Sequence, residues 1–277
     1  MDKNTQLCIS IAARPGSFGT VLHNTAYAAL GLNFVYKACS VSDVREAMNA
    51  VRTLGIRGCS VSMPFKQLVI PCLDEVDPEA GRIGAVNTVV NYQGVLTGYN
   101  TDLAGILGAL HTLSLRPKDR ILVLGNGGSA RAILAALWKL GIGHVSVAAR
   151  KNRQSLSQSF LGSASQIEWE NREKEEADVL INATPIGMCP DNGSMPVCEH
   201  FLDSCRAVMD MVMSPFETKL IQYALSRGKL VAPGYQVGLE QVKAQFFLYT
   251  GVAAPQKAMQ EAMKQLVGGE GMQSEPK

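Results

Sequence analysis

The sequence predicts an α/β fold with parallel strands, divided into two domains. Short apolar segments alternate with helix-like segments along most of the chain, which is the pattern of a parallel sheet covered by helices. The length of 277 residues fits two domains of roughly 100–150 residues each. A break at Ser114–Asp119, which contains Pro117, separates two such series. We therefore expect residues 103–233 to form one domain, and residues 1–102 and 234–277 to form the other.

Apolar runs and helical spacing place the elements of the first series. Runs bounded by turn residues predict strands at Leu7–Ala12, Phe34–Ala38, Arg57–Ser62, Thr88–Asn91 and Val95–Thr97. Apolar residues at helical spacing predict helices at Phe18–Leu30, Val41–Leu54 and Thr101–Leu113. The first two helices stop at Gly31 and Gly55, and Tyr92-Gln93-Gly94 joins the last two strands as a hairpin.

The second series follows the same pattern. It predicts strands at Ile121–Gly125, Val145–Ala149, Val179–Asn182, Val208–Met211 and Leu230–Ala232. It predicts helices at Ala130–Leu140, Tyr235–Thr250 and Pro255–Leu266, and a small, polar tail at Gly268–Lys277. A chain that leaves one domain and later returns to it leaves a cleft between the two, and such clefts are common ligand sites.

Composition excludes several classes of protein. With 47% hydrophobic and 18% charged residues the chain can bury a core, and a net charge of +2 does not favour nucleic acid or an acidic membrane surface as a partner. No run approaches the roughly 18–20 apolar residues of a membrane helix, and the polar start predicts a cytoplasmic protein. The seven cysteines lack a C-x-x-C pair or a zinc pattern, so we expect reduced, mostly buried thiols and no metal.

A glycine-rich turn follows the apolar strand at Ile121 and opens a helix. Its residues are Gly125, Asn126, Gly127, Gly128, Ser129 and Ala130. A strand, a glycine-rich turn and a helix form the setting of a dinucleotide site, because glycines admit the pyrophosphate and the helix start offers free N–H groups. The pattern is G-x-G-G-x-x-x-A rather than G-x-G-x-x-G, and a tight turn without a ligand is the alternative.

The end of the next strand indicates which dinucleotide binds. NAD enzymes usually place a carboxylate there for the ribose hydroxyls. This chain instead has Arg150, Lys151 and Arg153, and basic side chains suit the 2′-phosphate of NADP. The sequence therefore favours NADP over NAD, although a solvated helix start would carry the same residues.

Lys66 and Asp102 are the candidates for proton transfer. Lys66 follows a predicted strand in a short turn with Pro64, and Asp102 opens a helix after the hairpin. Alone, Lys66 could be a surface charge and Asp102 a helix-start carboxylate. Hydride transfer needs a partner for the hydroxyl proton, and a lysine held by a carboxylate can serve. Oxidoreductase chemistry thus gives both residues a use.

Several motifs, in order over about residues 6–266, resemble the shikimate dehydrogenase family. The segments that resemble family motifs are Val61–Lys66 (VSMPFK), Ala85–Thr88 (AVNT), Asn100–Asp102 (NTD), Gly125–Ala132 (GNGGSARA), Ile181–Met188 (INATPIGM) and Asp210–Leu220 (DMVMSPFETKL), with Gly234 and Gln241 beyond them. The resemblance implies an N-terminal α/β substrate domain, completed by C-terminal helices, and a Rossmann-like NADP domain. It implies an enzyme that interconverts shikimate and 3-dehydroshikimate.

The resemblance also implies roles for individual residues. Lys66 and Asp102 would form the catalytic pair. Substrate contacts would come from Ser17, Ser62, Asn87 and Gln241. The glycine-rich turn and Arg150 would bind the cofactor phosphates, and Thr184 and Gly234 would lie along the nicotinamide. His23 reads as a structural residue at a helix start.

Two positions depart from the family pattern in a way that bears on substrate. The second serine of the opening motif is Gly19, and the tyrosine of D-x-x-Y is Met213. Two lost hydroxyls remove two hydrogen bonds, each worth roughly 0.5–1.5 kcal/mol. The chain thus resembles the divergent shikimate dehydrogenase-like branch most closely.

Three alternatives stay open at this point. The substrate could be a related cyclic hydroxy acid such as quinate or an aminoshikimate, or the chain could be a non-catalytic NADP- or metabolite-binding regulator. A purely structural protein is the third, which the polar motifs disfavour. A monomer and a homodimer both fit the sequence.

Overall fold

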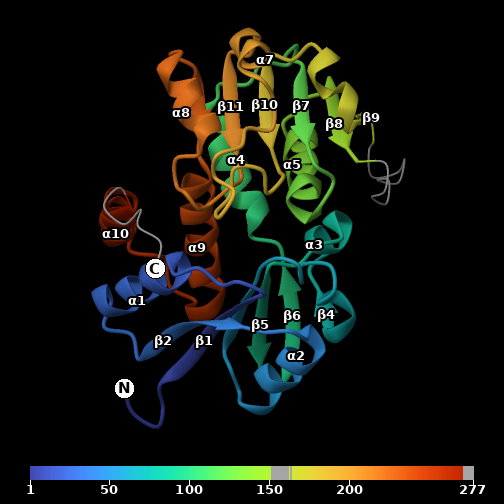
Figure 1. Cartoon of the computed structure of the whole chain (residues 1–277). Coiled ribbons are helices and arrows are strands. Elements are labelled where there is room, and N and C mark those ends of the chain that lie inside the picture. Colours follow the sequence, from blue (N-terminus) through green and yellow to red (C-terminus); the bar gives the residue numbers. More distant parts are fainter. Residues whose placement is uncertain (151–161, 163, 271–277) are drawn as a thin grey trace. The chain divides into compact units, whose positions relative to one another are not determined.

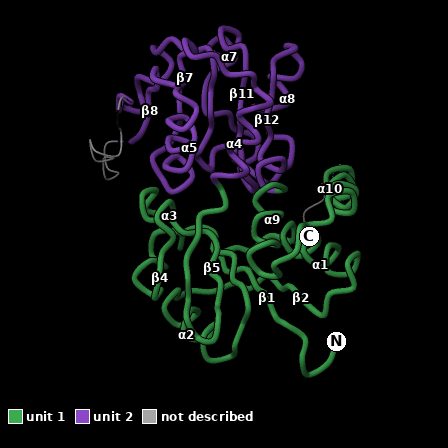
Figure 2. The backbone as a smooth tube through the Cα atoms, turned by 180° about the vertical axis from the view of Figure 1, so that it is seen from behind, with its two compact units in different colours: residues 1–102, 239–277 green, residues 103–238 purple. Residues whose placement is uncertain are grey.

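The alternation of strands and helices in the sequence produces two separate sheets, each in a compact unit of its own (Figure 2). The computed structural model describes residues 1–150, 162 and 164–270. Unit 1 comprises residues 1–102 and 239–277, and unit 2 comprises residues 103–238. The second unit therefore ends at Gly238, inside a helix, rather than at the expected residue 233.

Unit 1 contains a six-stranded mixed sheet in the order β2-β1-β3-β5-β6-β4 (Figure 1). Its strands are β1 (Gln6–Ala12), β2 (Phe34–Ser40), β3 (Gly58–Val61), β4 (Glu75–Val76), β5 (Thr88–Tyr92) and β6 (Val95–Tyr99). β1 runs parallel to β2 and β3, whereas β5 is antiparallel to both β3 and β6. β5 and β6 form the expected hairpin, with Gln93 and Gly94 in left-handed conformations at its turn. The antiparallel pairing of β5 with β3 was not expected.

Helices cover both faces of this sheet. They are α1 (Phe18–Ala29), α2 (Val44–Thr53), the 3₁₀ turn Ile70–Cys72, α3 (Pro78–Ile83), the end of α9 (Gly234–Thr250) and α10 (Gln256–Glu270). The side chains of β1 alternate between two cores, because successive strand residues point to opposite faces. Cys8 joins the core built with α1, α9 and α10, whereas Ile9 and Ile11 join the core built with α2.

Capping residues set where the helices of unit 1 begin. α2 starts at Val44 rather than Val41, because the Asp43 carboxylate accepts hydrogen bonds from the N–H groups of Arg45 and Glu46. Asp77 caps α3 in the same way, with Pro78 at the first helical position. These signals are present in the sequence, and α3 was missed because it is only six residues long.

Unit 2 contains a parallel, doubly wound sheet of the Rossmann type. Its strands are β7 (Ile121–Leu124), β8 (Val145–Ala149), β9 (Ser165–Glu168), β10 (Val179–Asn182), β11 (Ala207–Asp210) and β12 (Leu230–Ala232). All pairs are parallel, in the order β12-β11-β10-β7-β8-β9. The strand order reverses between β7 and β10, and ligands of such sheets bind beyond the carboxyl ends of the strands at this point.

The helices of unit 2 are α4 (Asp102–Thr112), α5 (Gly128–Lys139), the 3₁₀ turn Trp169–Lys174, α7 (Glu199–Ser204) and α8 (Lys219–Ser226). Arg206 closes the carboxyl end of α4, donating to the carbonyls of Leu113 and Ser114 and pairing with the buried carboxylate of Asp119. Every residue of β7, β10 and β11 is buried, as strands of a sheet covered on both faces should be.

The structure also describes all seven cysteines. All seven cysteines are free thiols, but only Cys8, Cys59 and Cys205 are buried, so the expectation of mostly buried thiols is wrong. Cys189 and Cys198 are exposed because both lie in the connection between β10 and α7. Within the part of the chain that the structure describes, no helix has the length and apolar character to cross a bilayer.

Candidate active site

Lys66 and Asp102 lie in contact in unit 1, with the Lys66 Nζ 2.5 Å from the Asp102 Oδ2. The turn after β3 carries Lys66, and two contacts fix it: Phe65 is buried in the core, and the Val86 N–H donates to the Lys66 carbonyl at 2.8 Å. The Asp102 side chain is 2% exposed and that of Lys66 is 16% exposed. The ammonium group is therefore the part of the pair that is open to a substrate.

Asn87 supports the Asp102 carboxylate from the other side. Its Nδ2 donates to Asp102 Oδ1 at 2.7 Å, and its Oδ1 accepts from the Thr101 N–H at 2.8 Å. Asp102 is also the first residue of α4, where the helix dipole favours a negative charge. Asn87 is wholly buried, so the structure shows it as a support for Asp102, and its expected contact with substrate stays a prediction.

The other expected substrate residues of unit 1 differ in exposure. Ser17 and Ser62 are exposed, and Gln241 on α9 is half-buried. Ser17 precedes α1, and its hydroxyl makes no capping hydrogen bond. A Cβ built at Gly19 would lie 3.5 Å from the Tyr36 hydroxyl, an ordinary contact distance, so packing does not force a glycine there. His23 is buried in the middle of α1 rather than at its start.

The glycine-rich turn of unit 2 has the form of a dinucleotide site. β7 ends at Leu124, Gly127 is the residue before α5, and Gly128, Ser129 and Ala130 form the first turn of that helix. The first amides of a helix have no carbonyl partner within it, and no acidic side chain occupies this turn to take them. The turn therefore presents N–H groups to an anion.

The glycines of this turn serve different purposes. Gly125 has φ +101°, and an added Cβ would come within 3.1 Å of the Ala183 carbonyl oxygen, so the fold itself requires a glycine there. Gly127 has φ −79°, and no atom lies within 4 Å of an added Cβ. The fold does not require Gly127, and the space directly beside it is open.

Arg150, the first of the basic residues expected to bind a 2′-phosphate, lies at the end of β8. Arg150 directly follows Ala149 and is exposed. Lys151 and Arg153 lie outside the described residues. Arg150 therefore sits at the carboxyl edge of the sheet, the edge from which the glycine-rich turn also projects.

A buried polar cluster that the sequence analysis missed braces the loops after β10 and β11. Asp210 accepts from Asn182 Nδ2 at 3.0 Å, from the Val212 N–H at 3.0 Å and from the Thr218 hydroxyl at 2.6 Å. Asn182 Oδ1 in turn accepts from the Thr184 hydroxyl at 2.6 Å. Burial raises the pKa of Asp210 to about 6. The polar residues that end β10 and β11 were the signal that could have revealed it.

The two expected nicotinamide-side residues lie in or against these braced loops: Thr184 follows β10, and Gly234 is the first residue of α9. The Thr184 hydroxyl donates to Asn182 and accepts from the Ile186 N–H at 3.2 Å, so its one hydrogen is used locally. Gly234 packs so closely that an added Cβ would lie 2.3 Å from the Val212 carbonyl oxygen. Met213, which replaces the family tyrosine, is half-buried in the loop after β11.

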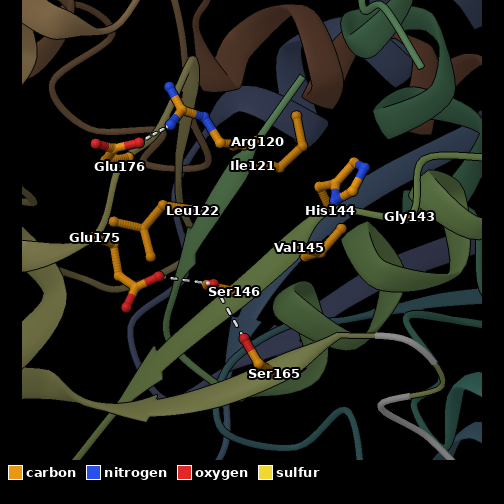
Figure 3. Close-up of a pocket in the computed structure, with 10 residues that line it drawn as sticks. All are labelled: Arg120, Ile121, Leu122, Gly143, His144, Val145, Ser146, Ser165, Glu175 and Glu176. Atoms are coloured by element: carbon orange, nitrogen blue, oxygen red, sulfur yellow. Dashed lines mark hydrogen bonds and ion pairs between the residues drawn. The ribbon is translucent and has the colours of Figure 1, made fainter. Parts of the chain in front are cut away.

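A pocket of about 300 Å³ lies at the opposite edge of the same sheet (Figure 3). Arg120, Ile121 and His144 line it at the amino ends of β7 and β8, together with Ser146 and Glu175. Glu175 accepts from the Ser146 hydroxyl at 3.0 Å. Ligands of doubly wound sheets bind at the carboxyl ends of the strands, so this hollow is not the cofactor site.

Known proteins resemble this chain over most of its length. Residues 15–89 match the model of the shikimate dehydrogenase substrate binding domain. A shikimate dehydrogenase-like protein from Haemophilus influenzae is 40% identical over 252 residues, which cover 90% of this chain and 92% of that protein. This chain belongs to the shikimate dehydrogenase family.

Solved structures of family members have the same fold. Shikimate 5-dehydrogenase from Thermus thermophilus, in complex with NADP(H) and shikimate, is 30% identical with a TM-score of 0.81, and 94% of this chain matches 98% of that one. Quinate dehydrogenase from Corynebacterium glutamicum, in complex with NAD, is 28% identical with a TM-score of 0.84, and 94% of this chain matches 99% of that one. One architecture thus serves different cyclic acids and both cofactors.

Proposed function

We propose that this protein is an NADP-dependent oxidoreductase that interconverts shikimate and 3-dehydroshikimate at the Lys66–Asp102 pair. The observation that carries the proposal is the 2.5 Å contact between a partly exposed ammonium and a buried carboxylate that Asn87 also holds. Two residues 36 positions apart come together in the arrangement that proton transfer needs.

Lys66 is the proton-transfer residue in this mechanism. In the direction of reduction, its ammonium group donates a proton to the substrate oxygen as that oxygen gains charge. In the direction of oxidation, its amine takes the proton from the substrate hydroxyl. Asp102 orients the Lys66 amine and balances its positive charge, and Asn87 keeps Asp102 from rotating. Ser17, Ser62 and Gln241 would hold the hydroxyls and carboxylate of the acid.

Unit 2 would hold the cofactor. NADP, when bound, supplies the hydride acceptor for oxidation and the hydride donor for reduction. The amides of Gly128, Ser129 and Ala130 would bind the pyrophosphate at the start of α5, where Gly127 leaves room. Arg150 would pair with the 2′-phosphate, and the loops that carry Thr184 and Gly234 would face the nicotinamide.

A second candidate is a dehydrogenase of a related cyclic hydroxy acid, such as quinate or an aminoshikimate. Gly19 and Met213 favour it, because two hydroxyls expected in the family are absent from this chain. The structural likeness to a quinate dehydrogenase supports it as well. Both candidates use the same proton-transfer pair and differ only in the acid that is bound.

Steady-state turnover with several acids tests the proposal. Purified protein is mixed with shikimate, quinate or an aminoshikimate, each with NADP and with NAD, and nicotinamide absorbance is followed. We expect turnover of shikimate with NADP, and a lower kcat/KM with NAD. Cofactor binding seen by fluorescence, without turnover of any of these acids, would contradict the proposal and favour the regulator.

A further inference from the structure

A chain of buried hydrogen bonds leads from α9 to Asp102. Gln245, on α9, is 2% exposed, and its Nε2 lies 3.0 Å from the Thr88 Oγ1 and 3.1 Å from the Ser60 Oγ. The Thr88 hydroxyl donates to Asn87 Oδ1 at 2.9 Å, and Asn87 Nδ2 donates to Asp102. Every member lies in unit 1, and the chain ends on the carboxylate that holds Lys66.

The groups involved fix which way the side-chain amides of Asn87 and Gln245 face. A carboxylate only accepts, so Asn87 must turn its Nδ2 toward Asp102 and its Oδ1 toward the Thr101 N–H and the Thr88 hydroxyl. The backbone carbonyl of Asn87, 3.5 Å from Gln245 Nε2, also only accepts. This side of Gln245 must therefore be its NH₂ group, and its Oε1 faces away from the site.

His23 fixes the outer end of the chain. Its Nε2 lies 3.4 Å from Gln245 Oε1, and its ring stacks on Tyr36 with the centroids 4.3 Å apart. Burial lowers the pKa of His23 to about 3, so the imidazole is neutral and carries one N–H. Because Gln245 Oε1 only accepts, that hydrogen belongs on Nε2.

We propose that Gln245 is a positioning residue for Lys66 and Asp102. His23 holds the Gln245 amide, so that the Gln245 NH₂ group donates to the Thr88 oxygen. The Thr88 hydroxyl then donates its hydrogen to Asn87, and the Asn87 NH₂ group donates to Asp102 Oδ1. Asp102 Oδ2 is then the oxygen that meets Lys66. Removal of the Gln245 amide leaves Thr88 without this donor and weakens one of the contacts that orient the Asn87 amide, beside those from Thr101. The inference rests on the proposed function of the Lys66–Asp102 pair.

Gln245→Met tests the inference, because methionine has a similar length and no hydrogen-bonding amide. We expect kcat to fall about 10-fold, since small displacements of reacting groups are costly, with little change in the KM for NADP. In protein with ¹⁵N-labelled asparagine, the side-chain NH₂ signals of Asn87 should shift, with or without substrate. His23→Phe keeps the aromatic stack, removes the donor and should have the same two effects.

Two matched controls isolate the hydrogen-bonded chain. Gln260→Met makes the same change at an exposed site on α10. Tyr249→Phe removes a hydroxyl that has no partner among the described residues, within the same aromatic core as His23. Both should match the wild type in kcat and in the Asn87 signals.

The outcomes separate this inference from the proposed function. Unchanged kcat and unchanged Asn87 signals in folded Gln245→Met would overturn the inference while leaving the proposed function standing. A wild type without turnover would overturn the proposed function, and the Asn87 signals would still decide whether Gln245 holds the Asn87–Asp102 contact. If Gln245→Met does not fold, His23→Phe is read by the same two criteria.

Discussion

At the residue scale, Asp210 differs from the other buried carboxylates of the molecule. Asp102 and Asp119 each have a basic partner, Lys66 and Arg206. Asp210 has three hydrogen-bond donors and no ion pair in the described part of the chain. Burial outweighs these donors and raises its pKa from 3.8 to about 6. A carboxylate with a raised pKa makes the folded state less stable as it ionises.

This raised pKa predicts a pH-dependent stability. The contribution of Asp210 is fully present below the unfolded pKa of 3.8 and is lost as pH rises through about 6. Asp210→Asn keeps the shape and most of the hydrogen bonds without the charge. We expect the wild type to lose about 2–3 kcal/mol relative to the variant between acidic and neutral pH. Urea unfolding of both proteins across this range measures it, and parallel curves would contradict the assignment.

Single residues could be predicted where a motif marks them. Lys66 and Asp102 follow from short motifs, and the structure brings them together as expected. The sequence could not reveal what supports them, because Gln245 reaches Thr88 across 157 positions and no local pattern encodes such a contact. The contacts of the buried Asn87 amide with Asp102 and Thr101 were likewise not predicted, and its expected contact with substrate stays a prediction.

At the element scale, the turn between β7 and α5 contains one glycine that the fold needs and one that it does not need. Gly125 adopts a left-handed conformation against the Ala183 carbonyl, whereas Gly127 has an ordinary conformation beside open space. A glycine at a position where the fold would accept a side chain indicates that a ligand comes close to the backbone there. The two positions should therefore respond differently to the same substitution.

Substitution of each glycine by alanine tests this difference. Gly127→Ala should cost at most about 1 kcal/mol of stability, the scale of a helix-cap change, but should raise the Kd for NADP at least about 10-fold. Gly125→Ala should destabilise the protein by more than this, because φ is positive and a carbonyl lies in the way. Thermal unfolding and a fluorescence titration measure both. Unaltered NADP affinity in Gly127→Ala would show that the turn does not hold the pyrophosphate.

Long apolar strands and helices could be predicted, and short or polar elements could not. The buried strands β7, β8 and β10 lie within a residue of their expected bounds. The polar strand β9 and the short helix α7 were missed, since neither has enough apolar residues to show a period. β4 has only two residues, fewer than any periodic signal needs.

At the scale of the whole molecule, the chain leaves unit 1 after Asp102 and returns to it at Leu239. The returning segment completes a core, because Phe246, Tyr249 and Met259 pack with Leu22 and Tyr27 of α1. Arg57 ties the end of α9 to the sheet, donating to the carbonyls of Tyr249 and Asn91 at 3.0 Å. The return also delivers Gln241 and Gln245 to unit 1.

The return of the chain could be predicted from the order of the elements, whereas its point of entry could not. The last strand of unit 2 ends at Ala232, so a boundary at 234 was the natural expectation. α9 crosses the boundary without a break, and its first turn belongs to unit 2. The first turn of α9 belongs to unit 2 because of its contacts there, since Gly234 packs on the Val212 carbonyl. The expected cleft between the domains stays a prediction.

Replacement of Lys66 by alanine tests the central claim most directly. The measurement is steady-state turnover of shikimate with NADP by the wild type, by Lys66→Ala and by Lys257→Ala, which removes an exposed lysine from α10. The account predicts a fall in kcat of about 10²–10⁴-fold for Lys66→Ala alone, with far smaller changes in KM and in the Kd for NADP. Turnover by Lys66→Ala at the wild-type rate would contradict it.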